Sequence, residues 1–237
     1  MIRNILFDLD DTLFDFQLAE KIALKKTLTQ LGIDPTDEVM AAYSEINREH
    51  WRMLEQGKIT RNELKSRRYR VLFDRYGFDA SEYEAAKTYE ALLGIGHHYI
   101  DGAHELPEEL CSRYDLYIVS NGTTCVQKGR IASSDIESFV KGIFISQEIG
   151  VNKPAKEFFD ACFAQMENAD RDASIIIGDS LTSDIQGGVN AGVRTVWFNP
   201  RGKANNSGIS PDYEIRALTE IPALIERISE DTEGKAS

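Results

Sequence analysis

Two aspartates separated by one residue, Asp8 and Asp10, directly follow a short apolar run near the start of the chain. The run, residues 5–7, is typical of a buried strand in a parallel sheet that is covered on both faces. Carboxylates two residues apart on a strand point to the same face. Two like charges this close are costly unless a cation or a shared proton relieves them. An acidic turn that only closes a strand is the simpler interpretation of these residues taken alone.

Four further apolar runs also have the character of buried strands. They cover residues 116–119, 142–145, 174–177 and 195–198. Ser120 and Asn121 follow the first of these runs, Lys153 comes after the second, and Asp179 follows the third. Each residue alone has an ordinary interpretation, as a turn, a surface lysine or a helix cap. Parallel strands end at one edge of a sheet, where open α/β folds bind ligands. The shared position at strand ends therefore predicts one site.

Helical stretches separate these runs. They lie near residues 123–133, 155–168 and 184–191, with a final helix at 217–228 and a polar tail at 229–237. Alternating strands and helices predict a parallel sheet with right-handed crossovers. The fold class is therefore α/β, with a Rossmann-like parallel sheet.

The stretch between the first and second strands is different, because residues 15–98 contain helical patterns only. Two helices are expected at 17–31 and at about 36–55. Thr60 with Glu63, and Ser81 with Glu84, fit the capping box that opens a helix. These two further helices are expected to end before Gly77 and near Gly94. We predict a four-helix domain at 15–98, inserted into a core formed by 1–14 and 99–237.

Composition excludes several partners. A formal net charge of −12 over 237 residues argues against a nucleic-acid polymer, which requires a basic surface. The first residues lead into acids, so neither a signal peptide nor a membrane span is expected. The three cysteines lack paired metal-ligand spacing and are interpreted as isolated thiols. We expect a cytoplasmic monomer or weak homodimer that does not bind membranes.

The strand-end residues together resemble the motifs of the haloacid dehalogenase superfamily. Its phosphatases carry Asp-x-Asp-x-Thr, then Ser or Thr, then Lys, then a late acidic pair. The matching residues here are Asp8, Asp10, Thr12, Ser120, Lys153, Asp179 and Asp184. The helical insertion is similar to the C1 cap of that superfamily. The resemblance also implies a sheet in which the first strand lies beside the second and the fourth.

The resemblance implies Mg²⁺-dependent phosphomonoester hydrolysis through an aspartyl-phosphate. Asp8 would be the nucleophile and Asp10 the general acid and base. Mg²⁺ would be held by Asp8, the Asp10 backbone carbonyl and Asp179, with Asp184 behind these ligands. The phosphate oxygens would be held by Thr12, Ser120, the Asn121 backbone amide and Lys153. Asp11 is expected to be solvated and to face away from its neighbours.

Other activities are also weighed. Halide release needs no proton, so the retained Asp10 favours a phosphatase over a haloacid dehalogenase. A phosphomutase remains possible, because it forms the same aspartyl-phosphate. A non-enzymatic binding module is disfavoured, because every catalytic position is filled.

The small-molecule substrate is suggested by a finer resemblance, to bacterial house-cleaning nucleoside 5′-monophosphate phosphatases, including pyrimidine nucleotidases. The matching residues include Phe14, Phe16, Asn47, Trp51, Leu64, Arg68, Asn121, Gln127 and Arg130. We expect Phe14, Phe16, Trp51 and Arg68 to contact substrate, with Phe16 and Trp51 stacking on a base. Arg48, Arg52, Arg67 and Arg68 would give the cap a basic side. Aromatic residues in a small helical domain are more often core residues, and a sugar phosphate or phosphoglycolate is the alternative substrate.

Overall fold

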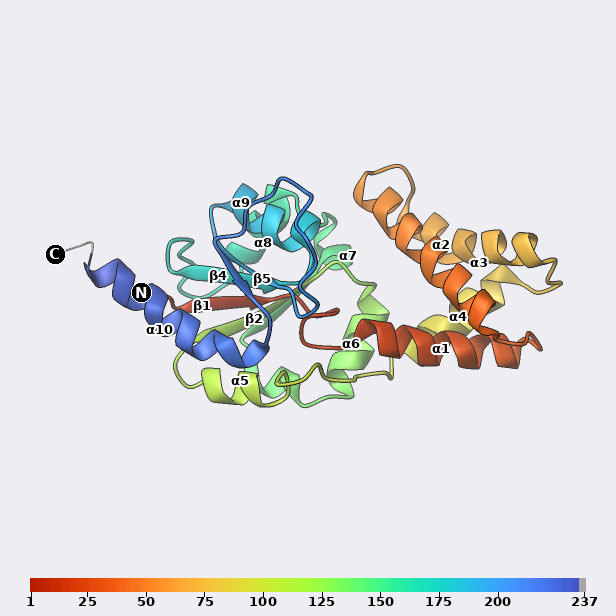
Figure 1. Cartoon of the computed structure of the whole chain (residues 1–237), viewed down its shortest axis with the longest axis horizontal. Coiled ribbons are helices and arrows are strands. Elements are labelled where there is room, and N and C mark those ends of the chain that lie inside the picture. Colours follow the sequence, from red (N-terminus) through yellow and green to blue (C-terminus); the bar gives the residue numbers. More distant parts are fainter. Residues whose placement is uncertain (235–237) are drawn as a thin grey trace.

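A computed structural model, which describes residues 1–234, contains a parallel sheet with helices on both faces and four helices beyond one end of the sheet (Figure 1). The strands are β1 (Asn4–Phe7), β2 (Asp115–Ser120), β3 (Gly142–Ile145), β4 (Ser174–Gly178), β5 (Arg194–Phe198) and β6 (Tyr213–Ile215). The helices are α1 (Phe16–Gln30), α2 (Asp37–Glu55), α3 (Arg61–Tyr76), α4 (Glu82–Leu93), α5 (Glu105–Leu110), α6 (Thr124–Ala132), α7 (Ser146–Ile149), α8 (Lys156–Phe163), α9 (Gln186–Ala191) and α10 (Ile221–Gly234).

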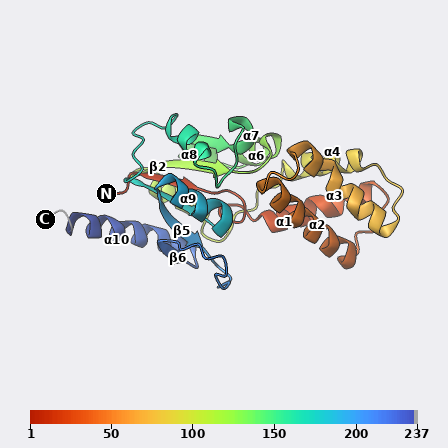
Figure 2. The ribbon, with the colours of Figure 1, turned by 90° about the horizontal axis from the view of Figure 1, so that it is seen from above.

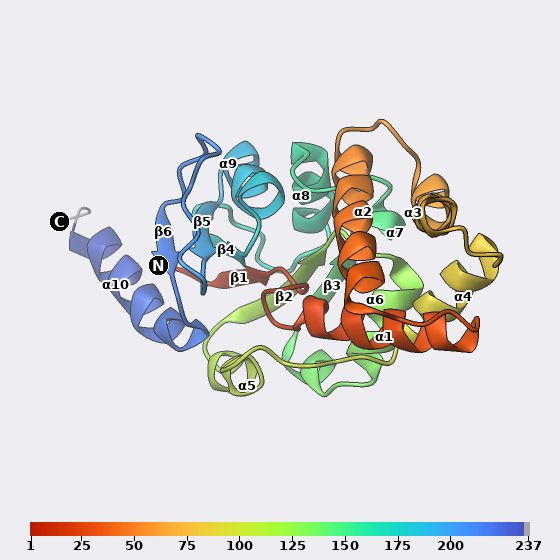
Figure 3. The same cartoon turned by 45° about the vertical axis from the view of Figure 1, so that its right-hand side comes forward.

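The strand order is β3-β2-β1-β4-β5-β6, and every neighbouring pair is parallel. The expected position of β1, between β2 and β4, is confirmed. Phe7 lies opposite both Ile118 and Ile177, so the chain leaves these three strands at one level. That register brings the residues after β1, β2 and β4 together. The carboxyl end of β1 points toward the four-helix group (Figure 3).

The two faces of the sheet are buried by different helices. Ile5 and Phe7 join an apolar cluster with side chains of α5 and α10, whereas Leu6 faces the opposite way toward α8. Figure 1 shows α8 and α9 on one side of the strands and α5 and α10 on the other. Burial of each large apolar side chain contributes about 1.5–3 kcal/mol. Burial on both faces explains why the strands are continuous apolar runs.

Helices α1–α4 pack around an apolar cluster that is largely their own, with Leu24, Tyr43, Leu72 and Tyr89 among its buried residues. Figure 2 shows the four helices grouped together, away from both chain ends. The expected four helices are confirmed. Both hydrogen bonds of the Thr60 capping box are present. The chain crosses between this group and the sheet twice, before α1 and after α4. The two crossing segments lie side by side, because the Asp15 backbone amide donates to the His98 carbonyl at 2.7 Å. The exact domain boundaries stay a prediction.

Several expected boundaries are wrong. Helix α8 ends at Phe163, and the stretch expected at 184–191 begins as a π-helical turn, Leu181–Ile185, before α9. The polar tail is also wrong, because α10 continues to Gly234; residues 229–233 contain neither glycine nor proline to stop it. Residues 235–237 lie outside the described part. The short elements α5, α7 and β6 were not predicted, because they contain too few residues to show a period.

No helix within residues 1–234 is both long enough and apolar enough to cross a membrane.

Candidate active site

The centre of the site is a buried lysine held between two carboxylates. Lys153 Nζ donates to Asp8 Oδ1 at 2.6 Å, to Asp184 Oδ1 at 2.7 Å and to the Val119 carbonyl at 2.8 Å. Lys153 and Asp184 are each about 1% exposed and Asp8 is 7% exposed. All three donor hydrogens of the ammonium group are therefore used, and Lys153 is fixed at the end of β1.

A third carboxylate joins the other two. One carboxylate oxygen from each of Asp8, Asp179 and Asp184 lies within 4.8 Å of the others. Burial first, and then the charge of Asp184, raise the pKa of Asp8 to about 8. Burial first, and then Asp184 and Asp8, raise the pKa of Asp179 well above its usual range. Lys153 supplies one positive charge against three carboxylates. Clustered carboxylate oxygens with excess negative charge suit a hard divalent cation, so these residues fit the expected Mg²⁺.

Local backbone features bring Asp184 into this cluster. The π-helical turn after β4 places its Oδ2 to accept a hydrogen bond from the Ser180 amide at 3.0 Å. A side chain at Gly178 would collide with the Asp184 carboxyl group, so this close approach requires glycine. π-Helical turns are frequent at functional sites.

Thr12 orients the nucleophile candidate. Its hydroxyl donates to Asp8 Oδ2 at 3.3 Å and accepts from the Asp179 amide at 3.1 Å. Thr12 is fully buried, and its expected contact with a phosphate stays a prediction.

The Asn121 side chain fixes the lysine segment. Its Nδ2 donates to the Lys153 carbonyl at 2.9 Å, and its Oδ1 accepts from the Lys153 amide at 2.8 Å. Ser120 Oγ accepts from Gln127 Nε2 at 2.8 Å and from the Gly122 amide at 3.1 Å. The phosphate contacts expected of Ser120, Lys153 and the Asn121 amide stay predictions, and the structure brings these residues to one rim.

Helix α6 holds Asp10. Gln127 Nε2 donates to Asp10 Oδ2 at 2.7 Å, and the buried Arg130 guanidinium forms an ion pair with Asp10 Oδ1. Arg130 Nε also donates to the Gly96 carbonyl at 2.9 Å, where the chain returns from α4. Sequence reasoning named both α6 residues without assigning them this role. The available signal was their spacing of three, which places them on one helix face.

Asp11 is half-buried, and backbone amides at the start of α1 hold its side chain, which the expectation of a solvated residue did not include. It has a left-handed backbone with φ of 58°, and its Oδ1 accepts from the Phe16 amide at 3.1 Å and from the Gln17 amide at 3.3 Å. Asp11 therefore anchors the start of α1 next to the site.

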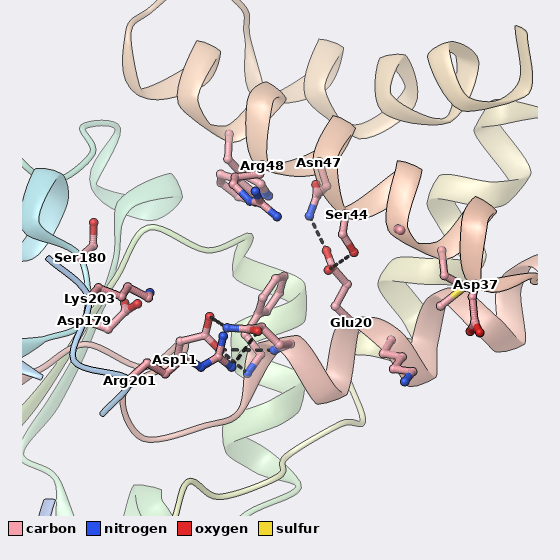
Figure 4. A pocket seen from close by; sticks show the side chains of 16 residues that line it. Asp11, Glu20, Asp37, Ser44, Asn47, Arg48, Asp179, Ser180, Arg201 and Lys203 are labelled. Carbon is pink, nitrogen blue, oxygen red and sulfur yellow. Dashed lines mark hydrogen bonds between the residues drawn. The ribbon is translucent and has the colours of Figure 1, made fainter. Parts of the chain in front are cut away.

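Several cavities meet this rim, and two of them are lined by Phe16, Trp51 and Asp179. One of about 940 Å³ lies between α1 and α2 and the segments that follow β4 and β5 (Figure 4). Arg48 points into it from α2, and Asp179 and Lys203 lie on the opposite wall. The second, of about 260 Å³, is lined by Asp8, Asp10, Asp11, Phe16, Trp51, Asn121, Gly122, Lys153, Asp179, Ser180, Ser183 and Asp184. The expected aromatic pair, Phe16 and Trp51, therefore lies on the same cavity as Asp8.

The other two expected substrate residues are buried. Phe14 is fully buried, and its ring packs edge-on against Tyr99 with centroids 5.0 Å apart, whereas its expected substrate contact stays a prediction. Arg68 is 3% exposed; it donates to Asn47 Oδ1 at 2.8 Å and lies over the rings of three tyrosines. It does not belong to an exposed basic side. Arg68 also lines a small cavity of about 30 Å³ beside Asp10, and its contact with substrate stays a prediction.

Comparison with known proteins identifies the class. Residues 5–198 match the family described as haloacid dehalogenase-like hydrolase. The chain therefore belongs to the haloacid dehalogenase-like hydrolases. Its parallel sheet with helices on both faces is consistent with this family.

Three relatives are informative. YfnB of Bacillus subtilis, named for the same family, is 42% identical over 219 residues, covering 92% of this chain and 93% of YfnB. Its magnesium-bound crystal structure superposes with a TM-score of 0.89 over 95% of this chain and 99% of that chain, at 40% identity. The pyrimidine 5′-nucleotidase PynA of Streptococcus pneumoniae is 36% identical over 220 residues, which cover 92% of this chain and 93% of PynA. A 2-haloacid dehalogenase of Pseudomonas syringae has a TM-score of 0.66 over 96% of this chain and 99% of that chain, at 25% identity.

Proposed function

We propose that the protein is a Mg²⁺-dependent phosphatase that hydrolyses nucleoside 5′-monophosphates. The observation that carries the proposal is Lys153 held between Asp8 and Asp184, with Asp179 beside them, at a cavity whose other wall bears Phe16 and Trp51. The name of PynA supports a nucleotidase, the name of YfnB supports a hydrolase of the same family, and the magnesium bound to YfnB supports the metal.

In this mechanism an Asp8 carboxylate oxygen forms a bond to phosphorus while the bond from phosphorus to the ester oxygen breaks. Asp10 donates a proton to the leaving oxygen and then takes one from the water that hydrolyses the aspartyl-phosphate. Lys153 offsets negative charge on the transferring group. Proton donation requires the Asp10 carboxyl group to leave its ion pair with Arg130, so α6 takes part in the acid–base step.

The metal would be held by Asp8 and Asp179, with Asp184 fixed behind them by Lys153 and the Ser180 amide. When bound, Mg²⁺ neutralises charge on the carboxylates and on the phosphoryl oxygens. Among the described residues, Asp8, Asp179 and Asp184 form the one cluster of three acids whose carboxylate oxygens lie close enough to surround an ion.

Replacing Asp179 with alanine is expected to weaken magnesium binding and activity together, because a charged ligand is removed. In metal proteins, loss of a residue that only contacts a metal ligand lowers metal affinity or activity by about 10–100-fold. Loss of the ligand Asp179 is therefore expected to raise the Mg²⁺ concentration needed for activity by at least that factor. The measurement is phosphate release against Mg²⁺ concentration, with Asp79→Ala as the exposed control. Excess chelator should silence the wild type, and undiminished release in chelator would refute the metal assignment.

Replacing Trp51 with alanine is expected to reduce discrimination for the base. Stacking of a base on an aromatic ring contributes about 1–3 kcal/mol, which corresponds to roughly tenfold to a hundredfold. The measurement is the ratio of kcat/KM for UMP to that for ribose 5-phosphate, which lacks only the base. Trp51→Phe should keep most of the ratio. An unchanged ratio in Trp51→Ala would remove Trp51 from base recognition.

The substrate class is tested by steady-state kinetics with UMP, dTMP, AMP, glucose 6-phosphate and phosphoglycolate. A base offers a flat face that Phe16 and Trp51 suit, whereas a sugar requires several polar side chains directed at its hydroxyls. We expect the nucleotides to be preferred. Preference for a sugar phosphate or phosphoglycolate would overturn the substrate class and keep the phosphatase. Phosphoryl return to a sugar would indicate a mutase, and halide release from a 2-haloacid with no phosphate release would overturn the reaction class.

A further inference from the structure

Arg61, the first residue of α3, reaches from the four-helix group to the sheet. Its Nη1 donates to the Asn121 carbonyl at 3.1 Å and to the Gly122 carbonyl at 3.2 Å. Its Nη2 donates to Ser146 Oγ at 3.0 Å and to Asn152 Oδ1 at 2.9 Å. All four acceptors belong to the segments that follow β2 and β3.

These acceptors are the supports of the lysine at the centre of the site. Asn121 bonds both backbone groups of Lys153 through its side chain, and Asn152 directly precedes Lys153. The Gly122 amide donates to Ser120 Oγ. The Arg61 guanidinium therefore contacts both the segment after β2 and the segment after β3. The distance between these two segments determines the position of Lys153 relative to Asp8.

The contact is directional and does not depend on opposite charge. All four acceptors that Arg61 contacts are neutral, and no carboxylate among the described side chains forms an ion pair with it. A planar guanidinium suits such a set, because its donors are fixed in one fork. The guanidinium carbon also lies 5.6 Å from the centre of the Trp51 ring, on the wall of the cavity. The geometry requires α3 to lie in this position against the sheet.

We propose that Arg61 is a positioning residue that couples docking of helices α1–α4 to the placement of Asn121 and Lys153 at the phosphate site. The inference rests on the proposed phosphatase function. When the helices move away, the segments that carry Asn121 and Lys153 lose their hydrogen bonds to Arg61. The affinity for a phosphoryl group then falls. Full phosphate affinity then exists only when the helices also cover the site and exclude water.

The test compares Arg61→Met and Arg61→Lys with the wild type, and with Arg70→Met as a control at an exposed position of α3. Calorimetry measures the affinity for inorganic phosphate, which carries no leaving group, in the presence of Mg²⁺. Hydrogen bonds from a charged donor predict a loss of about 10–100-fold in Arg61→Met, with a smaller loss in Arg61→Lys. X-ray scattering in solution should show a larger radius of gyration for Arg61→Met, and kcat/KM for UMP should fall by a similar factor. Arg70→Met should match the wild type.

Unchanged phosphate affinity in a folded Arg61→Met protein would overturn the proposal. The same holds if only UMP hydrolysis falls, because Arg61 would then act on the leaving group through Trp51. If Arg61→Met does not fold, Arg61→Lys decides by the same phosphate measurement, with wild-type affinity counting against the proposal. Phosphate binding and scattering need no turnover. A wild type that hydrolyses no phosphomonoester would therefore refute the proposed function while both measurements still test Arg61.

Discussion

Asp8→Asn is expected to reduce phosphate release by about 10⁴-fold or more while the protein remains folded, because an amide oxygen is a poor nucleophile toward phosphorus. Losses of this size follow removal of a single residue from a catalytic group that acts as a unit. The amide has the same shape as the carboxyl group and still accepts from Lys153 Nζ, which lies 2.6 Å from Asp8 Oδ1. Burial and the charge of Asp184 disfavour the Asp8 carboxylate, so a neutral side chain also relieves repulsion in the metal-free protein.

The measurement is single-turnover phosphate release with UMP, together with thermal unfolding of the same preparation. Asp74→Asn, at an exposed position of α3, is the matched control and should keep wild-type activity. Retained activity in a folded Asp8→Asn protein would show that another residue attacks phosphorus. Trapping of a phosphorylated wild-type protein by rapid acid quench would support Asp8 directly if the label maps to its peptide.

Lys153→Met is expected to lower the free energy of unfolding by about 3–5 kcal/mol, because removal of one partner leaves buried charge uncompensated. Methionine has similar length and fills the space, so the cost arises from Asp8 and Asp184 rather than from a cavity. Mg²⁺ should restore part of the loss, since an ion that binds only the folded state stabilises it. The measurement is denaturant unfolding with and without Mg²⁺. Phosphate release should be lost in both conditions.

The control for this change is Lys156→Met. Lys156 pairs with Asp160 at 2.8 Å, but its side chain is 58% exposed, and an exposed pair of this kind contributes about 0–1 kcal/mol. Equal losses in the two variants would mean that Lys153 does not hold the carboxylates in place. A stability loss in Lys153→Met that Mg²⁺ does not reduce would contradict the proposed charge balance at the site.

Five of the six strands, β1 to β5, and the residues at the rim of the sheet were predicted from the sequence. Strands β1, β2 and β4 are buried on both faces, so their apolar runs mark them without an alignment. Parallel pairing then brings Asp8, Ser120 and Asp179 to one edge, whatever the length of chain between them. The positions of the strands and the shared rim therefore follow from local pattern and one topological rule, whereas the strand order and the inclusion of Asp184 came from the family resemblance.

The direction of individual side chains could not be predicted in this way. The hydroxyl of Thr12 has the chemistry to bind phosphate, but packing turns it toward Asp8 and the Asp179 amide. Phe14 and Arg68 have the types expected of binding residues, yet tertiary packing buries both. The contacts of Arg130 with Asp10 and of Arg61 with Asn121 join residues 120 and 60 positions apart. Neither contact has a periodic signal, because each depends on how helices dock.

The separate apolar cluster of α1–α4 has a consequence for how this enzyme could change over evolutionary time. Its side chains hardly mix with those that bury the sheet, so substitutions within this apolar cluster leave the packing of the sheet undisturbed. Arg61 of α3 differs, because it contacts the segments that hold Lys153. The helices also begin soon after β1 and Asp8, which places them beside the proposed reacting atoms. A descendant could change its substrate through substitutions at Trp51 and its neighbours, while the proposed catalytic residues at the rim of the sheet stay the same.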